Sequence, residues 1–266
     1  MIARPVYAVL EREVVRMVRQ RARLVSAMVR PLIWLFVIGA GLGSFVGTTQ
    51  GIGYQAFLVP GVIGMTALFG AMLAALTTVY DKESGVMRMM IIAPLPHYWI
   101  VVAKMLSAAL AAVLQALLLI AILAALGLLG PSTRYGLLAI ALPATALACA
   151  GIGMITASFS RTLDNFAAIM NFVIFPVFFL SGSLYPVREL PDLLRWIALA
   201  NPYTYGVDLL KHAALPAGRM GADFAVSTDL AVLAGFTLAA LLAASWRFSR
   251  ESAYEPMIHV LAGKRG

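Results

Sequence analysis

The fold is decided by residues 31–80, which read PLIWLFVIGAGLGSFVGTTQGIGYQAFLVPGVIGMTALFGAMLAALTTVY and contain no Asp, Glu, Lys or Arg. A helix that crosses a bilayer core of about 30 Å needs about 20 consecutive apolar residues. The stretch is therefore long enough for two membrane spans, and its Gly- and Thr-rich segment 47–53 is the natural place for the turn between them. We expect spans near 31–49 and 57–79.

Further stretches without charged residues follow along the chain, and they predict spans near 102–127, 135–159, 165–184 and 228–247. The sequence thus predicts an all-α membrane protein with six transmembrane helices. We expect one transmembrane domain over 31–250 and a cytoplasmic tail over 251–266. No internal repeat and no second soluble domain are apparent.

The composition supports this class. Of the 266 residues, 62% are hydrophobic and 12% are charged, whereas soluble domains are about 45–50% apolar and about 25% charged. The formal net charge of +8 does not indicate nucleic acid, because the basic residues gather between apolar runs rather than in a stripe. The single cysteine, Cys149, lies inside an apolar run and cannot form an internal disulfide.

The distribution of Lys and Arg predicts the orientation. If the N-terminus lies inside, the inner segments hold fifteen basic residues and the outer segments five, so both termini should be cytoplasmic. The N-terminal segment 1–30 is not typical of a cleavable signal. Its apolar residues recur near helical spacing with arginines between them, which favours a basic amphipathic helix at the inner lipid surface. A loose topogenic arginine tail is the alternative.

Several common motifs are missing from the sequence. There is no phosphate-binding loop of the form G-x-x-x-x-G-K-[ST], so we expect no ATP site in this chain. The motifs typical of membrane proteases and lipases are also absent. No charged residue lies near the middle of a predicted span, which argues against an ion-coupled carrier. We therefore expect no catalytic residues, no metal site and no cofactor in the chain.

The predicted inner segment after the second span begins with acidic residues, continues with a methionine-rich apolar face and stops at two prolines. Acidic residues favour a helix N-terminus, and methionine-rich faces suit docking on a partner protein. We interpret the segment as a short coupling helix; packing against its own bundle is the alternative. The candidate coupling residues are Asp81, Lys82, Glu83, Gly85, Val86, Met87, Arg88, Met89 and Met90.

The segment between the fifth and sixth spans predicts two half-length helices that are too polar to cross the membrane. Pro191 suits a helix start, and Asn201-Pro202 breaks the chain before a second helix. We interpret this region as an extracytoplasmic re-entrant or interfacial hairpin with aromatic anchors at the membrane surface. Its candidate residues are Tyr185, Pro186, Pro191, Asn201, Pro202, Tyr203, Tyr205 and Asp208.

Two further groups of residues concern helix packing. Gly39, Gly43 and Gly47 have the spacing that permits close helix contact, and we hypothesise that they face a second subunit or the fifth span; packing within the subunit is the alternative. Gln115 and Asn171 are the most polar side chains inside predicted spans. They are candidates to line a translocation path, although hydrogen bonds between helices would explain them equally.

Three motifs in order carry a resemblance to a known family. They are Asp81-x-Glu83-x-Gly85-Val86-Met87, followed by Pro94 and Lys104, then the run Phe179-Leu180-Ser181-Gly182 that ends at Tyr185-Pro186, and finally Asn201-Pro202-x-Thr204-Tyr205. The chain resembles the permease subunit of type-2 ABC exporters, which includes permeases for lipo-oligosaccharide nodulation factors, polysaccharides and drugs. The usual inner motif, Glu-Glu-Gly or Glu-x-Gly-Thr, is Glu83-Ser84-Gly85-Val86 here.

This resemblance implies a permease of the bacterial inner membrane that exports an amphipathic, lipid-linked, glycan or drug-like substrate. It implies a second copy of the chain or a paralogous permease, two separate ATP-binding subunits that hold the ATP and magnesium, and contact with membrane lipids but not nucleic acid. Two alternatives are a membrane scaffold without a transport path and an ion-coupled carrier.

Overall fold

The computed structural model describes residues 11, 15, 21–49, 52–87, 97–216 and 221–262. The first long helical stretch consists of α2, a π-helical segment η1 and α3, and a two-stranded antiparallel ribbon of β1 and β2 follows it. In chain order these elements are α2 (Arg21–Ile33), η1 (Trp34–Ile38), α3 (Gly39–Val46), β1 (Thr48–Thr49) and β2 (Ile52–Gly53).

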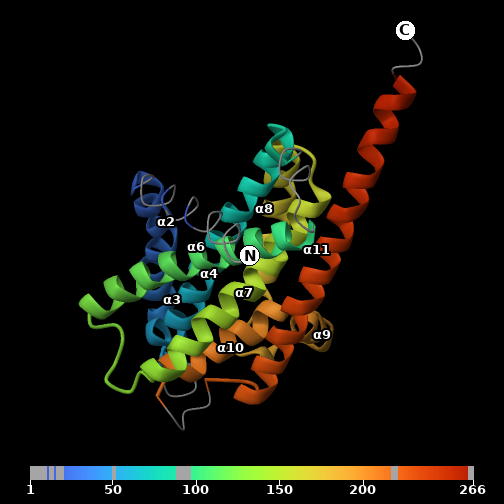
Figure 1. Cartoon of the computed structure of the whole chain (residues 1–266). Coiled ribbons are helices and arrows are strands. Elements are labelled where there is room, and N and C mark those ends of the chain that lie inside the picture. The colour runs from blue at the N-terminus through green and yellow to red at the C-terminus, as the bar shows by residue number, and fades with distance from the viewer. Residues whose placement is uncertain are drawn as a thin grey trace.

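Three long helices come next and form the centre of the molecule, as Figure 1 shows. Three shorter helices, a 3-10 turn and a final long helix follow among the described residues. These elements are α4 (Tyr54–Glu83), α6 (His97–Ala125), α7 (Tyr135–Phe159), α8 (Leu163–Phe179), η2 (Val187–Glu189), α9 (Asp192–Ala200), α10 (Pro202–Ala214) and α11 (Val226–Ala262). In the view of Figure 1, the last part of α11 extends beyond the other helices toward the C-terminus.

Among the described residues, five helices are long and apolar enough to cross a membrane: Ala27–Val46, Tyr54–Glu83, Tyr98–Ala125, Tyr135–Phe159 and Val226–Ser249. The sixth predicted span, near 165–184, corresponds to α8, which is apolar but has only 17 residues. At about 1.5 Å per residue such a helix is shorter than a bilayer core of about 30 Å. Helix α8 by itself therefore does not confirm a sixth full-length transmembrane helix.

The reason lies in the residues that follow α8. Pro176 lies inside its last turn, and a proline cannot donate a backbone hydrogen bond. Three residues after the helix ends, Gly182 adopts a φ of +76°, a conformation that glycine reaches without strain. A mainly apolar stretch thus ends as a helix before it is long enough to span the membrane by itself.

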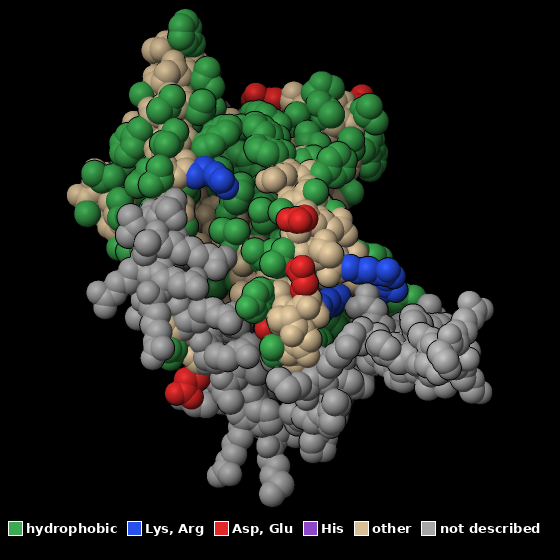
Figure 2. All heavy atoms as spheres, turned by 90° about the horizontal axis from the view of Figure 1, so that it is seen from above, with side chains coloured by type: hydrophobic (Ala, Val, Ile, Leu, Met, Phe, Trp, Pro, Cys, Tyr) green, Lys and Arg blue, Asp and Glu red, His purple; other side chains and the backbone are tan. Residues whose placement is uncertain are grey.

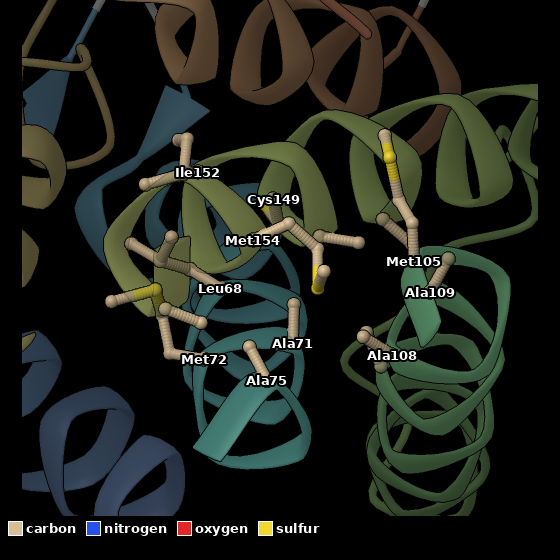
Figure 3. Packing of buried hydrophobic residues seen from close by; sticks show 14 of the residues in the cluster. Leu68, Ala71, Met72, Ala75, Met105, Ala108, Ala109, Cys149, Ile152 and Met154 are labelled. Atoms are coloured by element: carbon tan, nitrogen blue, oxygen red, sulfur yellow. The ribbon is translucent and has the colours of Figure 1, made fainter. Parts of the chain in front are cut away.

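The main hydrophobic core lies where α4, α6 and α7 meet, and Figure 3 shows part of it. The side chains there are small or flexible, including Ala71 and Ala75 of α4, Ala108 of α6 and Met154 of α7. Small side chains allow the backbones to approach closely. One such close approach is at Gly153 of α7, where an added Cβ would lie 2.9 Å from the Cβ of Ala75. These contacts make α4 the central helix of the bundle.

Large hydrophobic side chains remain exposed on the outside of the bundle. Phe172 of α8 is 80% exposed, and Leu242 of α11 is 70% exposed. Figure 2, which looks at the molecule from above the view of Figure 1, shows hydrophobic side chains over much of the described surface and few charged ones. A soluble monomer rarely exposes so much apolar surface, whereas a membrane protein presents it to lipid.

More than half of the predicted N-terminal amphipathic helix lies outside the described part of the chain. Within 1–30, the structure describes Glu11, Val15 and residues from Arg21 onward, where α2 begins. Helix α2 continues through Arg30 and Pro31 into the first span. The surface location expected for segment 1–30 therefore stays a prediction.

Candidate functional site

Polar side chains gather at the two ends of the bundle. The motif Asp81-Lys82-Glu83 lies at the C-terminal end of α4, and we call this the Asp81 end. At the start of α4, the Tyr54 hydroxyl donates a hydrogen bond to the Leu184 carbonyl, and Lys211 lies over the Phe57 ring. We call this opposite end the Lys211 end.

The Asp81 carboxylate pairs with the Lys104 ammonium group of α6. Both side chains are almost fully buried, Asp81 at 3% exposure and Lys104 at 2%. The two residues come from different helices and are separated by 23 positions in the sequence. A buried charge is tolerated when an opposite charge and hydrogen bonds compensate it. The pair therefore joins the end of α4 to the first turns of α6.

Lys82 contacts a second helix. Its Nζ donates hydrogen bonds to the carbonyls of Ala157 (3.1 Å) and Ser158 (3.4 Å), which lie at the C-terminal end of α7. It also lies 4.5 Å from the centroid of the Phe248 ring of α11. A cation at a helix C-terminus satisfies carbonyls that have no partner within the helix and interacts favourably with the helix dipole.

Glu83 contacts a third helix. Its carboxylate accepts a hydrogen bond of 3.1 Å from the backbone N–H of Leu163, the first residue of α8. The Thr162 hydroxyl accepts a second bond from the N–H of Asn165 in the same first turn. A carboxylate is favourable at a helix N-terminus. Three consecutive charged residues of α4 thus contact α6, α7 and α8 in turn.

The residues after Glu83 end α4 sharply. Gly85 has a φ of +77°, which the residue closing a helix often adopts and which only glycine reaches freely. Val86 is partly exposed, but Met87 is only 5% exposed and packs in the main core, so this methionine is not on a free docking face. The other candidate coupling residues, Arg88, Met89 and Met90, lie outside the described residues.

At the Lys211 end, two short helices occupy the region of the predicted hairpin, but their surroundings differ. Pro191 precedes α9 and Pro202 is the first residue of α10. Helix α9 lies at the surface, with Leu193 at 74% and Trp196 at 71% exposure, whereas α10 is largely buried among α4, α7 and α11. The two short helices therefore lie in different layers.

Asn201 connects α8, α9 and α10. Its Oδ1 accepts a hydrogen bond from the N–H of Tyr203 and so caps the N-terminus of α10. Its Nδ2 donates to the Val177 carbonyl in α8 at 2.7 Å. Pro186, which precedes η2, is buried. The sequence pattern around Asn201-Pro202 pointed to a helix break, and the structure adds the contact with α8.

The three tyrosines of this region have different surroundings. The Tyr185 hydroxyl donates to the Phe179 carbonyl, and the Tyr205 hydroxyl donates to the Leu199 carbonyl at 2.9 Å. Tyr203 is fully buried and lies against Gly64 of α4, where an added Cβ would come within 2.7 Å of its hydroxyl. Burial raises the pKa of Tyr203 well above its ordinary value. Tyr203 is thus a core residue rather than a surface anchor.

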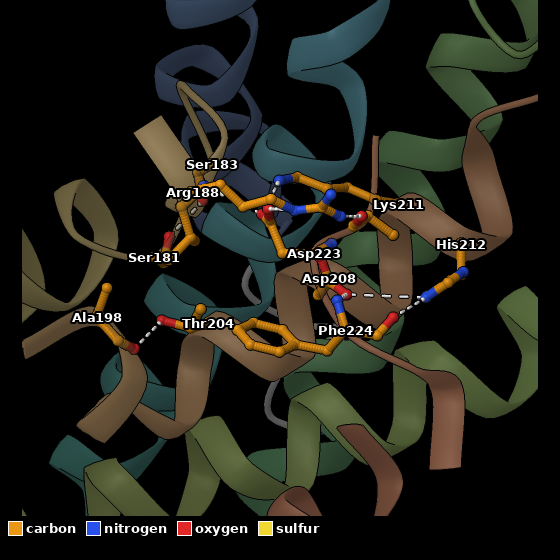
Figure 4. A network of polar contacts seen from close by, with 12 residues as sticks. Ser181, Ser183, Arg188, Ala198, Thr204, Asp208, Lys211, His212, Asp223 and Phe224 are labelled. Atoms are coloured by element: carbon orange, nitrogen blue, oxygen red, sulfur yellow. Dashed lines mark hydrogen bonds and ion pairs between the residues drawn. The ribbon is translucent and has the colours of Figure 1, made fainter. Parts of the chain in front are cut away.

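The largest polar network lies beside α10 and is shown in Figure 4. The Asp208 carboxylate accepts hydrogen bonds from the backbone N–H groups of Asp223 (2.6 Å) and Phe224 (2.9 Å). The Asp223 carboxylate in turn accepts bonds from the N–H of Val187 (3.1 Å) and the Nε of Arg188 (2.9 Å). These bonds hold the segment before α11 against both α10 and η2.

Lys211 contributes the buried positive charge of this network. Its Nζ lies 3.8 Å from the Asp223 carboxylate and 5.0 Å from the Phe57 ring centroid. Burial lowers the pKa of Lys211, and the nearby Asp223 and Asp208 act in the opposite direction. Burial also raises the pKa of Asp208, although its two backbone hydrogen bonds favour the charged form. The network thus holds charged groups at some cost in solvation.

Of the charged residues in this region, the sequence analysis proposed only Asp208 as a site residue. Arg188 and Lys211 were only counted among the five basic residues of the predicted outer segments. Asp223, His212 and Asp229 were not proposed as site residues. A usable signal was present, because Asp229 lies inside the stretch 228–247 predicted as a span, and a charged residue within a span is a functional candidate by default.

The three packing glycines have different neighbours. At Gly39, an added Cβ would lie 3.3 Å from the Cγ of Gln55 and 3.5 Å from Leu58, so this glycine packs against α4 of the same chain. At Gly43, no described atom would lie within 4 Å. Gly47 ends α3 with a φ of +67°. The described neighbours thus place only Gly39 in a close helix contact.

The two polar span residues also differ. Gln115 of α6 is 6% exposed, and its Oε1 lies where a side chain on Gly70 of α4 would come within 2.8 Å. Its location is a helix–helix contact within the chain. Asn171 of α8 is exposed and lies next to Phe172. Of the two, only Asn171 faces out of the chain.

Comparison with known proteins identifies the family. The model of the family described as ABC-2 type transporter matches residues 4–215. The chain is 34% identical to Nodulation protein J of Rhizobium leguminosarum bv. trifolii over 193 residues, which cover 71% of this chain and 73% of that protein. It is 27% identical to Nodulation protein J of Sinorhizobium fredii, covering 83% and 86% of the two chains.

A relative with a different name is also similar. The putative transport permease ycf38 of Pyropia yezoensis is 26% identical over 216 residues, which cover 76% of this chain and 70% of that protein. The family model extends from the N-terminal region through α10 and so includes the Asp81 end and the α10 residues of the Lys211 end. The chain therefore belongs to the ABC-2 type transporter family of membrane permeases.

Proposed function

We propose that the chain is the permease subunit of an ATP-driven exporter, and that it forms the outward path for an amphipathic, lipid-linked, glycan or drug-like substrate. Family membership supports the transport role. The similarity to proteins named Nodulation protein J favours the lipid-linked and glycan classes among these substrates. ATP and magnesium would be bound by separate ATP-binding subunits, two for each exporter.

The observation that carries the proposal is the arrangement of Asp81, Lys82 and Glu83. Each of these neighbours contacts a different helix, α6, α7 or α8. A force applied to the end of α4 would therefore reach three other helices at once. We assign the residues that come after Glu83 in the chain, including Arg88, Met89 and Met90, to contact with the ATP-binding subunit. When that subunit binds nucleotide, it would push on the Asp81 end.

The proposed placement has the Asp81 end in the cytoplasm of a bacterial cell and the Lys211 end on the outer side of the inner membrane. The excess of Lys and Arg in the inner segments supports this orientation. Helix α8, together with the residues up to Tyr185, would complete the sixth crossing, and α9 and α10 would form the re-entrant hairpin. Non-helical backbone at this depth is tolerated where protein covers it.

We also propose that two copies of the chain, or this chain and a paralogue, form the path together. The exposed face of α8 supports this, because the polar Asn171 lies there beside Phe172 and Phe175, which are 80% and 52% exposed. A polar side chain is unfavourable against lipid. A cysteine at Phe172, in a chain whose Cys149 is replaced by Ala, should cross-link two copies in membranes, whereas one at Leu238 of α11 should not.

The direct test of the function uses the chain co-expressed with its ATP-binding subunit and reconstituted in vesicles. The double variant Glu83→Ala plus Arg88→Ala should insert in the membrane normally and lose transport or ATPase stimulation. A matched control is Glu189→Ala plus Arg195→Ala, which removes one exposed acid and one exposed base at the Lys211 end. Wild-type ATPase stimulation in the first variant would contradict the coupling role.

The two alternative functions predict different outcomes in the same vesicles. A scaffold protein would support no ATP-dependent movement of lipid-linked or glycan substrate with any partner. An ion-coupled carrier would move substrate in response to an ion gradient without an ATP-binding subunit. Either result with the wild-type chain would replace the exporter proposal.

A further inference from the structure

Asp229 is the charged residue at the Lys211 end whose surroundings are least accounted for. It lies in the first turn of α11 and is 0% exposed. Among the described residues, neither of its carboxylate oxygens has a hydrogen-bond partner. Ionisation of a buried carboxylate that has no partner is strongly unfavourable. Asp229 is therefore either a neutral acid or a carboxylate that another group compensates.

The neighbouring carboxylates of Asp208 and Asp223, unlike that of Asp229, have hydrogen-bond partners among the described residues. Asp208 accepts two backbone hydrogen bonds, and Asp223 is bonded to Val187 and Arg188 and lies near Lys211. The two basic residues of the network are thus already engaged with Asp223. A third buried carboxylate then leaves this part of the described structure with an excess of negative charge.

The potential ligand atoms near Asp229 form a compact group. One carboxylate oxygen each from Asp208 and Asp229 and one imidazole nitrogen of His212 all lie within 4.8 Å of one another. The Nε2 of His212 is 3.8 Å from the Oδ2 of Asp208 and 2.8 Å from the Phe224 carbonyl oxygen. These atoms come from α10, from α11 and from the segment that precedes α11.

We propose that Asp208, His212 and Asp229 bind a divalent transition-metal ion of the zinc class, with the Phe224 carbonyl oxygen close enough to serve as a further ligand. No catalytic role is assigned to this ion, and the inference is independent of the proposed export function. The ion would compensate the Asp229 carboxylate and complete the charge balance of the network.

The ligand chemistry favours zinc over the hard cations. An imidazole nitrogen with two carboxylates suits Zn²⁺ and its neighbours, whereas Ca²⁺ and Mg²⁺ prefer sites made only of oxygen. Zinc ligands lie about 2.0–2.2 Å from the ion in a tetrahedral arrangement, so two ligands of one ion lie about 3.4 Å apart. Ligand atoms that lie within 4.8 Å of one another would move together by up to about 1.4 Å when the ion binds. The partly exposed His212, at 22%, provides access from the surface.

A metal ion bound here would connect α10, the segment before α11 and α11. Asp208 and His212 lie four residues apart on α10, Asp229 starts α11, and Phe224 lies on the segment held by Asp208. Binding would add to the hydrogen bonds of that segment and fix the start of α11 against α10. Because the ion would bind only the folded chain, zinc should stabilise the protein by an amount that grows with the logarithm of the free zinc concentration above the Kd.

The test uses the full chain purified in detergent, with zinc alone as the probe. After loading and dialysis, the wild-type protein should retain about one zinc per chain, and zinc should raise its Tm. Asp229→Asn and His212→Gln should each weaken zinc binding by more than about tenfold, since even changes around the ligands cost about 10–100-fold. Asp192→Asn and His259→Gln, which replace an exposed acid of α9 and a histidine near the end of α11, should bind like wild type.

A second measurement needs no variant. Loading the wild-type chain with Co²⁺ should produce the visible absorption of a low-coordinate cobalt site, and added zinc should remove it. If wild-type protein retains no zinc and shows no cobalt spectrum, the proposal is wrong and Asp229 is buried as the neutral acid. Equal zinc binding by wild type and Asp229→Asn would also overturn it, because the ion would then lie elsewhere.

Discussion

The carboxylate of Asp81, at the end of α4, and the ammonium group of Lys104, in α6, form an ion pair that is almost completely shielded from solvent. Such a pair contributes little net stability relative to two apolar residues, but losing one partner leaves a buried charge. The pair therefore adds little to the free energy of unfolding. Its main effect is to fix how α4 and α6 pack against each other.

The first prediction concerns this pair. Lys104→Met should destabilise the protein by about 3–5 kcal/mol, because the buried Asp81 carboxylate then loses Lys104 as its ionic partner. The double variant Asp81→Leu plus Lys104→Met should recover most of that loss, since both charges of the pair are then absent. Thermal unfolding in detergent measures both effects. A double variant that is less stable than Lys104→Met would show that the ion pair itself is strongly favourable.

The second prediction concerns the end of α4. Gly85→Ala should cost about 1–2 kcal/mol, because the φ of +77° is unfavourable for a residue with a Cβ. Space is not the reason, since no described atom lies within 4 Å of the added Cβ. Gly41→Ala is the matched control, because it too has open space but lies within α3 at an ordinary φ. It should be neutral or slightly stabilising.

If Gly85→Ala lowers the Tm no more than Gly41→Ala does, the sharp end of α4 does not depend on glycine. At roughly 2–4 °C per kcal/mol for a chain of this size, the expected difference is measurable. The comparison also bears on transport, because the position follows directly after the residues that contact α6, α7 and α8.

The helices could be predicted from charge-free stretches because a bilayer permits few other backbone structures. This reasoning located α4, α6 and α7, but it overestimated α8. Counting apolar residues takes no account of where a helix ends, and Pro176 and Gly182 end α8 inside an apolar stretch. Pro176 and Gly182 were visible in the sequence as residues that can end a helix. The prediction nevertheless followed the high hydropathy of residues 165–184.

The charged network at the Lys211 end could not be predicted in the same way. Arg188 lies in η2, Asp208 in α10, Asp223 in the segment before α11 and Asp229 in α11. No periodic pattern connects these four residues. Their association depends on how η2, α10 and α11 pack, which the sequence alone does not give. At the Asp81 end the charged residues are consecutive, so a short motif indicated them, although not which helix each one contacts.

Spacing between glycines likewise indicates close contact without naming the partner. Gly39 and Gly43 have the same spacing pattern, but the neighbours of Gly39 are in α4, and Gly43 has open space among the described residues. The closest approach of backbones instead occurs at Gly61, whose added Cβ would lie 2.6 Å from the Ser183 carbonyl oxygen. No repeat of glycines marks that position.

The third prediction follows from this contrast. Gly61→Ala should destabilise the protein by about 1–3 kcal/mol, because a backbone carbonyl rather than a flexible side chain occupies the space. Gly43→Ala should have little effect on the stability of the single chain. If Gly43 faces a second copy, as the glycine spacing suggests, its substitution should instead weaken dimerisation. Tm measurements combined with the oligomeric state in detergent separate the two outcomes.

The fourth prediction separates the two hydrogen bonds of Asn201. Asn201→Ala should cost about 2 kcal/mol, of which about 1 comes from the lost cap of α10 and about 1 from leaving the Val177 carbonyl without this donor. Asn201→Ser keeps an oxygen that can cap the helix but is too short to reach α8, so it should lose about half as much. Thermal unfolding of the three proteins gives this ranking. Equal losses in both variants would assign the whole effect to the contact between α10 and α8. Transport should then fall with that contact, because Asn201 bonds the junction of α9 and α10 to α8.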